Sequence, residues 1–302
     1  SCDLIIKWYN RIKLLTPEGD VMLKSGLYEQ IINQGINEEL KSTDKIIRLK
    51  NIDEGESSKV LAQYASEIIE KGLNQLGDDK LPEKIELINK MIEVIRAKTG
   101  DEDFTSMSVD ERAEQLLALL DKENSKYAID QNSTVIRPET SIAQSSLFTS
   151  AVNEPQLLGE LKKEIVSADR IDMIVSFIKW SGVRRIINEL KDFTDKGGEL
   201  RIITTSYMGA TDVKAIEELR KLSNTMIKVS YDTKVTRLHV KSYVFYRDTG
   251  FTTAYVGSSN LSGAAISTGR EWNVKVTNKD LPDTIKKISA IFESYWNSND
   301  FE

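Results

Sequence analysis

The chain has 302 residues, 40% of them hydrophobic and 29% charged, which is enough for about two domains with packed cores. One cysteine, Cys2, and one histidine, His239, exclude an internal disulfide and an ordinary zinc site built from Cys and His. No run of 18 or more apolar residues occurs, and the first residues lack the shape of a signal peptide. We therefore expect a cytoplasmic protein with no membrane partner.

Four segments in the first half of the chain carry apolar residues at helical spacing. They are residues 25–41, 57–75, 81–97 and a segment that begins with the capping box Ser108–Glu111. We therefore expect residues 1–124 to form a small all-helical domain. Its apolar stripes are expected to form its core, the alternative being a groove for a partner.

Residues 125–150 are polar and without periodicity, which predicts an interdomain linker. Beyond the linker, segments with helical and strand patterns alternate. The helices are predicted at 156–167, 182–195, 212–222 and 282–297, and the strands between them at 171–178, 200–206 and 226–231. This alternation predicts an α/β sandwich with a mixed sheet over residues 151–302.

Three further strand-like runs carry polar residues near one end. These runs cover residues 238–246, 253–260 and 270–276. In the first run His239 and Lys241 share one face, because side chains alternate along a strand, and the other face is largely apolar and expected to look inward. Neighbouring strands would bring five polar residues to one place: His239, Lys241, Ser258, Asn260 and Glu271.

These residue types suit attack on a phosphodiester. A histidine acts as a nucleophile or as a proton donor near neutral pH, while lysine, serine and asparagine bind phosphoryl oxygens. A glutamate such as Glu271 orients the imidazole. In-line displacement at phosphorus needs a nucleophile on one side and a proton donor on the other, yet the chain has one histidine.

The order His-x-Lys, Gly-Ser-x-Asn and a downstream Glu resembles the motif of the phospholipase D superfamily. The resemblance extends from about Ser145 to the C-terminus. Within this superfamily, the sequence most resembles the N-terminal phospholipase D-like domains of bacterial DEAD/DEAH-type helicases and metal-independent restriction endonucleases. The family usually has an Asp five residues after the Lys, a position held here by Tyr246, and Asp248 lies two residues further on.

The resemblance implies a hydrolase, a phosphodiesterase of the nuclease type that needs no metal and no other cofactor. It also implies a two-fold site, which chains with a single motif complete by forming a homodimer. His239 of one subunit would attack phosphorus to give a phosphohistidine, and His239 of the partner subunit would protonate the leaving group. Lys241 and Asn260 would hold the phosphoryl oxygens, Ser258 would support the pocket, and Glu271 would fix the imidazole.

Charge is unevenly distributed along the chain. Residues 151–302 carry 22 Lys and Arg against 20 Asp and Glu, whereas residues 1–150 carry 19 against 27. The mildly basic second half favours a local nucleic-acid site, with DNA as the expected partner, although surface charges of this kind are often only solvated. The expected substrate-binding residues are Lys179, Trp180, Arg237 and Arg270. For the Trp180 side chain, core packing is an equal alternative to stacking on bases.

The resemblance further implies a helicase-linked DNA-processing or restriction and defence protein, with a helicase region as partner on a longer chain. This sequence itself contains no Gly-x4-Gly-Lys-[Ser/Thr] phosphate loop. One open alternative is a catalytically weak or inactive module for DNA docking and dimerisation of a helicase. Another is a metal-dependent nuclease that uses Asp192, Glu199 and Arg201. A lipid-cleaving enzyme is disfavoured, since no membrane-binding stretch is apparent.

Overall fold

The computed structural model describes residues 23–119, 135–151, 153–231 and 238–301. The chain divides into two compact units, Ser1–Gln115 and Leu116–Glu302. The domain boundaries expected from composition, at residues 124 and 150, stay predictions, and residues 125–134 of the expected linker lie outside the described residues. In the described ranges, no helix is long and apolar enough to cross a membrane.

The described part of the first unit contains helices and no strands. They are α2 (Gln34–Ser42), α3 (Ser57–Gln75), α4 (Leu81–Thr99) and the short 3-10 helix η1 (Glu102–Met107). The helices predicted at 57–75 and 81–97 are confirmed, and α4 is capped by Gly100, whose left-handed φ of 71° suits a glycine. No side chain among the described residues of this unit is buried. The expectation that its apolar stripes form a core is therefore wrong for the part described.

Helix α2 is shorter than the segment predicted at 25–41. Residues 25–33 are not helical, and the helix begins only after Asn33. The side chain of Asn33 accepts a hydrogen bond from the backbone N–H of Ile36 at 3.0 Å. This bond satisfies one of the free donors of the first turn, which places the start of the helix here.

The helix predicted from the capping box at Ser108–Glu111 does not form, and residues 108–119 contain no helix. Asn89 of α4 instead binds the backbone of Val109 twice. Its Oδ1 accepts the Val109 N–H at 2.8 Å, and its Nδ2 donates to the Val109 carbonyl at 3.0 Å. Because that carbonyl would be needed inside a helix, the contact with α4 stabilises a non-helical backbone.

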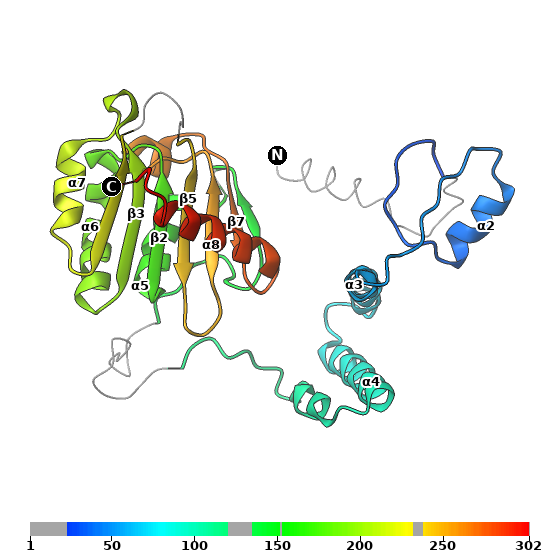
Figure 1. Ribbon diagram of the computed structural model, residues 1–302. Helices are drawn as coiled ribbons and strands as arrows, with labels where there is room; N and C mark the ends of the chain where they lie inside the picture. The colour runs from blue at the N-terminus through cyan, green and yellow to red at the C-terminus, as the bar shows by residue number, and fades with distance from the viewer. Residues whose placement is uncertain (1–22, 120–134, 152, 232–237, 302) are drawn as a thin grey trace. The chain divides into compact units, whose positions relative to one another are not determined.

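The second unit is built on one seven-stranded sheet in the order β1-β7-β6-β5-β2-β3-β4 (Figure 1). Its strands are β1 (Ser146–Phe148), β2 (Arg170–Val175), β3 (Glu199–Thr205), β4 (Thr225–Ser230), β5 (Lys241–Tyr246), β6 (Thr253–Gly257) and β7 (Asn273–Thr277). Strands β2, β3 and β4 pair in parallel, and every other pairing is antiparallel. The predicted α/β fold with a mixed sheet is confirmed.

Helices cover both faces of this sheet. They are α5 (Leu157–Ser167), α6 (Trp180–Asp195), α7 (Val213–Arg220) and α8 (Pro282–Trp296), with the short 3-10 helix η2 (Tyr207–Gly209) and the short π-helix η3 (Ala264–Thr268). Figure 1 shows α8 in front of the sheet and α5 and α6 behind it. The four long helices lie close to the segments predicted for them from periodicity.

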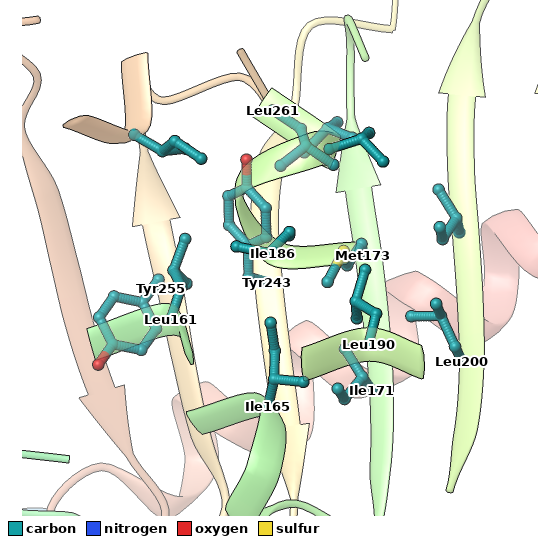
Figure 2. Packing of buried hydrophobic residues seen from close by; sticks show 14 of the residues in the cluster. Leu161, Ile165, Ile171, Met173, Ile186, Leu190, Leu200, Tyr243, Tyr255 and Leu261 are labelled. Atoms are coloured by element: carbon teal, nitrogen blue, oxygen red, sulfur yellow. The ribbon is translucent and has the colours of Figure 1, made fainter. Parts of the chain in front are cut away.

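The larger core lies between the sheet and helices α5, α6 and α7. Figure 2 shows Leu161 and Ile165 of α5 and Ile186 and Leu190 of α6 close to side chains of the sheet. Burial of each such aliphatic side chain contributes about 1.5–3 kcal/mol to stability. The opposite face of β5 is also covered, because Val244 packs in a cluster that includes a residue of α8. The face with Val244, which was predicted to look inward, is therefore buried, and the face with Tyr243 and Phe245 is buried as well.

A buried carboxylate ties α5 to the strands that carry the motif. Glu164 of α5 is fully buried, with Arg247 Nη2 2.5 Å from one oxygen and Lys275 Nζ 3.0 Å from the other. The hydroxyls of Thr253 and Tyr255 donate to it at 2.8 and 3.0 Å. Burial alone raises the pKa of Glu164, but the charges of Arg247 and Lys275 outweigh burial, so its pKa lies below the ordinary value. The carboxylate therefore stays ionised near neutral pH.

We expect Glu164→Gln to lower the free energy of unfolding by about 3–5 kcal/mol, because two buried cations lose their counter-charge. Urea unfolding followed by circular dichroism measures the loss. The matched control is Glu218→Gln, which removes an exposed ion pair with Lys221 and should cost less than about 1 kcal/mol. Equal effects of the two variants would contradict a structural role of the buried carboxylate.

Stability should also depend on pH through Glu164. Its pKa is lower in the folded state, so its contribution is present above the unfolded-state pKa of about 4.3 and is lost as pH falls through the folded pKa. We expect the urea midpoint of the wild type to fall more steeply below pH of about 4 than that of Glu164→Gln, which has no proton to gain. Parallel pH curves for the two proteins would contradict this linkage.

Candidate functional site

The histidine and lysine of the motif lie where β5 begins. His239 is exposed just before the strand, and Lys241, its first residue, is 5% exposed. The Nζ atom of Lys241 lies 3.0 Å from Nδ1 of His239 and donates to its backbone carbonyl at 2.9 Å. Burial lowers the pKa of Lys241, and the negative charge of Glu271 acts against that shift. Glu271 is therefore within electrostatic reach of the His239–Lys241 pair.

The sheet topology explains why residues from three runs meet. Strand β6 is antiparallel to both β5 and β7, so the end of β6 lies beside the start of each neighbour. Ser258 and Asn260 follow the end of β6, while Glu271 precedes the start of β7. The predicted catalytic residues thus lie at one edge of the sheet.

Ser258 and Glu271 are joined directly. The Ser258 hydroxyl donates to a carboxylate oxygen of Glu271 and accepts the backbone N–H of Trp272 at 3.1 Å. The Ser258 N–H also donates to the Trp272 carbonyl at 3.0 Å, which extends the β6–β7 ladder by one pair. Among the described residues, Glu271 has no hydrogen bond to His239. Its role in orienting the imidazole stays a prediction.

Asn260 holds the turn after β6 against the loop after β2. Its Oδ1 accepts the backbone N–H of Phe177 at 3.0 Å. The same two loops are joined by the Lys179 N–H, which donates to the Leu261 carbonyl at 2.9 Å. Because the Oδ1 atom of Asn260 is occupied, the Nδ2 group is the part of its amide that is left to donate to an anion.

These loop contacts bring Lys179 and Trp180 close to the turn that contains Asn260. Lys179 Nζ lies 3.1 Å from a carboxylate oxygen of Asp212, and the other oxygen accepts the Trp180 N–H at 2.9 Å. Trp180 is half-buried and packs against the main core, with Lys214 Nζ 4.8 Å from its ring centre. Packing against the core therefore accounts for at least part of the burial of this side chain. Asp212, which stands just before α7, was missed because it belongs to no motif.

Of the two expected substrate-binding arginines, the structure describes one. Arg270 is exposed and directly precedes Glu271 in the chain. Arg237 lies outside the described residues. The expectation that they bind substrate stays a prediction for both.

Tyr246 occupies the position at which the phospholipase D superfamily, which the motif resembles, usually has an Asp. It is the last residue of β5, whereas Lys241 is the first, so about 16 Å of strand separates them. Its hydroxyl donates to Ser289 of α8 at 3.0 Å, and the guanidinium of Arg170 lies 3.9 Å from its ring centre. The departure from the family pattern therefore serves the contact between the sheet and α8 and leaves the His–Lys end of the strand unchanged.

The contacts of Arg201 do not match the alternative metal-dependent site, because its hydrogen-bond partners are other carboxylates. The Arg201 guanidinium instead binds both oxygens of Asp172, at 2.7 and 2.8 Å, and a Glu293 oxygen at 2.6 Å. No group of three or more His, Cys, Asp or Glu side chains in the described ranges is placed to hold a metal ion. The geometry therefore gives no support to a site built on Asp192 and Glu199.

The comparisons with known proteins agree with the motif. Residues 161–296 match the family model described as cardiolipin synthase, PLD-like domain. This part of the chain is therefore similar to a phospholipase D-like domain. Similar solved structures include NucT from Helicobacter pylori, with 19% identity, a TM-score of 0.41 and coverage of 50% of this chain and 94% of that chain. Nuc from Salmonella typhimurium, a phospholipase D family member, has 21% identity, a TM-score of 0.39 and coverage of 51% and 94%. No curated protein sequence matches the chain.

We expect the two ends of the Asn260 amide to have separate roles, which two variants would distinguish. Asn260→Asp keeps the acceptor for the Phe177 N–H but replaces the donor with an anionic oxygen. We expect it to unfold within about 0.5 kcal/mol of the wild type, yet to bind inorganic phosphate at least about tenfold more weakly, because a charge-assisted bond is lost.

The companion variant Asn260→Ala removes both ends, so it should in addition lose about 1–3 kcal/mol of stability. Calorimetric titration with phosphate and thermal melts measure the two effects. Unchanged phosphate binding by the Asp variant would contradict the assignment of Nδ2 as the donor.

Proposed function

We propose that this chain is a metal-independent nuclease that cleaves nucleic acid, with DNA as substrate, through a phosphohistidine at a homodimeric active site. The observation that carries the proposal is the contact between exposed His239 and buried Lys241. This pair lies at the sheet edge that also holds Ser258, Asn260 and Glu271. A phosphodiesterase of the phospholipase D-like family accounts for all five residues.

Two donors are arranged to bind the phosphoryl group. The Lys241 ammonium has three N–H groups, of which two are directed at His239, so one is left for a phosphoryl oxygen. The Asn260 Nδ2 group supplies a second donor. Together they stabilise the negative charge that develops on these oxygens during displacement.

The hydrogen bond at Nδ1 of His239 decides which role the imidazole plays. When the Lys241 ammonium donates to Nδ1, the neutral ring carries its proton on Nε2. The proton donor is the imidazolium, which forms when Nδ1 gives up this bond and takes up a proton. The nucleophilic form needs a free Nε2 lone pair, a proton on Nδ1 and an acceptor for that proton. Glu271, whose charge reaches Lys241, is the carboxylate proposed for that task.

The proposed reaction has two displacements at phosphorus. In the first, Nε2 of His239 forms a bond to phosphorus, the bond to the leaving oxygen breaks, and that oxygen takes a proton from His239 of the partner subunit. In the second, water replaces Nε2 and gives its proton to the same partner imidazole. Because one chain contains a single histidine, the scheme requires two subunits.

Basic residues beside this edge support nucleic acid as the substrate class. Arg270 is exposed next to Glu271, and Lys179 borders the turn that contains Asn260. Phosphate contacts of this type position a nucleic-acid backbone. The resemblance of the motif segments extends the proposal to a helicase-linked DNA-processing or restriction and defence protein that acts in the cytoplasm.

Cleavage in excess EDTA tests the chemistry. We expect the wild type to cut single- or double-stranded DNA without metal, and His239→Ala to lose at least about 100-fold in rate, because both the nucleophile and the proton donor are removed. His239→Gln serves as a control that keeps a polar side chain. A strict magnesium requirement would contradict the mechanism. DNA binding by both proteins without any cleavage would favour a docking module.

The oligomeric state tests the two-fold site. Light scattering at micromolar concentration should give about twice the chain mass of 34.1 kDa, because a single His-x-Lys motif completes the site only in pairs. The measurement is repeated at the dilution used for cleavage. An active species of 34.1 kDa at both concentrations would contradict the shared site.

A further inference from the structure

Trp272 is an exposed aromatic residue fixed beside the candidate site. Its side chain is 64% exposed, although tryptophan usually buries most of its large apolar surface. Its backbone is held by Ser258 on both sides, since its N–H donates to the Ser258 hydroxyl and its carbonyl accepts the Ser258 N–H. The position of the residue is therefore well defined, and its indole is free for a partner.

The strand register places the indole next to Ser258. Val256 pairs with Val274 and Gly257 with Asn273, so Ser258 and Trp272 stand directly opposite each other. Opposed residues of an antiparallel pair share one face, with Cβ atoms about 4.5–5.5 Å apart. The strands can approach this closely because Gly257 has no Cβ, and a Cβ at this position would overlap the Trp272 carbonyl oxygen. The indole thus starts one side-chain width from Ser258, at the end of the strands and on the face opposite to that of Lys241.

A nucleic acid has flat bases that can stack on this exposed indole. The segment from Arg270 to Trp272 presents an exposed cation, the carboxylate linked to Ser258 and an exposed aromatic ring in succession. A phosphodiester at the pocket carries a base on each side, and a base stacked on an aromatic side chain contributes about 1–3 kcal/mol to binding. A base inside a duplex is already stacked, so such a platform favours unpaired strands.

We propose that Trp272 is the stacking platform for the nucleobase next to the cleaved phosphodiester and that it gives the site a preference for single-stranded nucleic acid. This inference rests on the proposed nuclease function. It adds a binding residue that the motif does not contain. The alternative is a contact with a second copy of the chain, because exposed Leu147, Val256 and Val274 lie in register on the same face. The exposed charge of Arg270 favours a phosphate chain over such an apolar contact.

The test combines Trp272→Ala with an oligonucleotide that lacks one base beside the cleaved bond. On the intact single strand, we expect the variant to raise KM about 5- to 150-fold with little change in kcat, because stacking is lost equally from the ground and transition states. Trp272→Phe should restore most of the loss. On the abasic strand, the wild type should be weakened by the same factor, and Trp272→Ala should cause no further loss. Leu147→Ala is the matched control from the same face and should leave KM unchanged.

Binding of the same strands, measured by fluorescence anisotropy in a His239→Ala background, separates this inference from the proposed function. Weaker binding by the Trp272 variant supports the platform even if no cleavage occurs. An active wild type with unchanged KM and binding in Trp272→Ala overturns the platform alone. Equal losses on intact and abasic strands overturn it as well. A fall to monomer mass in both Trp272→Ala and Leu147→Ala would overturn it in favour of a contact between copies.

Discussion

The register of β5, β6 and β7 is the constraint on which the site depends, and the buried carboxylate of Glu164 helps to set it. This one side chain binds Arg247 after β5, Thr253 and Tyr255 of β6, and Lys275 of β7. A slip of one residue in a strand would turn every side chain to the other face. Removal of a buried ion partner is costly, so the network opposes such slips. The positions of the motif residues, at the opposite ends of the same strands, depend on this register.

The two ends of β5 therefore have different tasks. At its start, Lys241 is buried against His239, with its ammonium nitrogen 3.0 Å from Nδ1 of the imidazole. At its end, Tyr246 binds Ser289 and Arg170 and secures α8. This separation explains how the chain departs from the family pattern at Tyr246 while the His–Lys contact is kept.

Much of the second unit follows from local pattern, because its helices and strands have clear periodicity and short connections. The helices α5, α6 and α8 lie close to their predicted segments, and the His239–Lys241 pair is visible as a motif. Other features depend on distant residues that share no motif. Glu164 meets Lys275 across more than a hundred residues, and Asp212 caps α6 from the loop before α7. The burial of the face of β5 that carries Tyr243 and Phe245 likewise depends on helices distant in the chain. The helix expected after Ser108 does not form, and Asn89 binds the backbone of Val109 instead.

The stereochemistry at phosphorus tests the central claim most directly. A phosphorothioate diester of one configuration at the cleaved position is hydrolysed by the wild type in EDTA and isotopically labelled water, and the configuration of the product is determined. Attack by His239 followed by water consists of two in-line displacements, so the account predicts net retention. Net inversion would mean a single direct attack by water and would contradict the phosphohistidine mechanism, whatever the effect of His239→Ala on the rate.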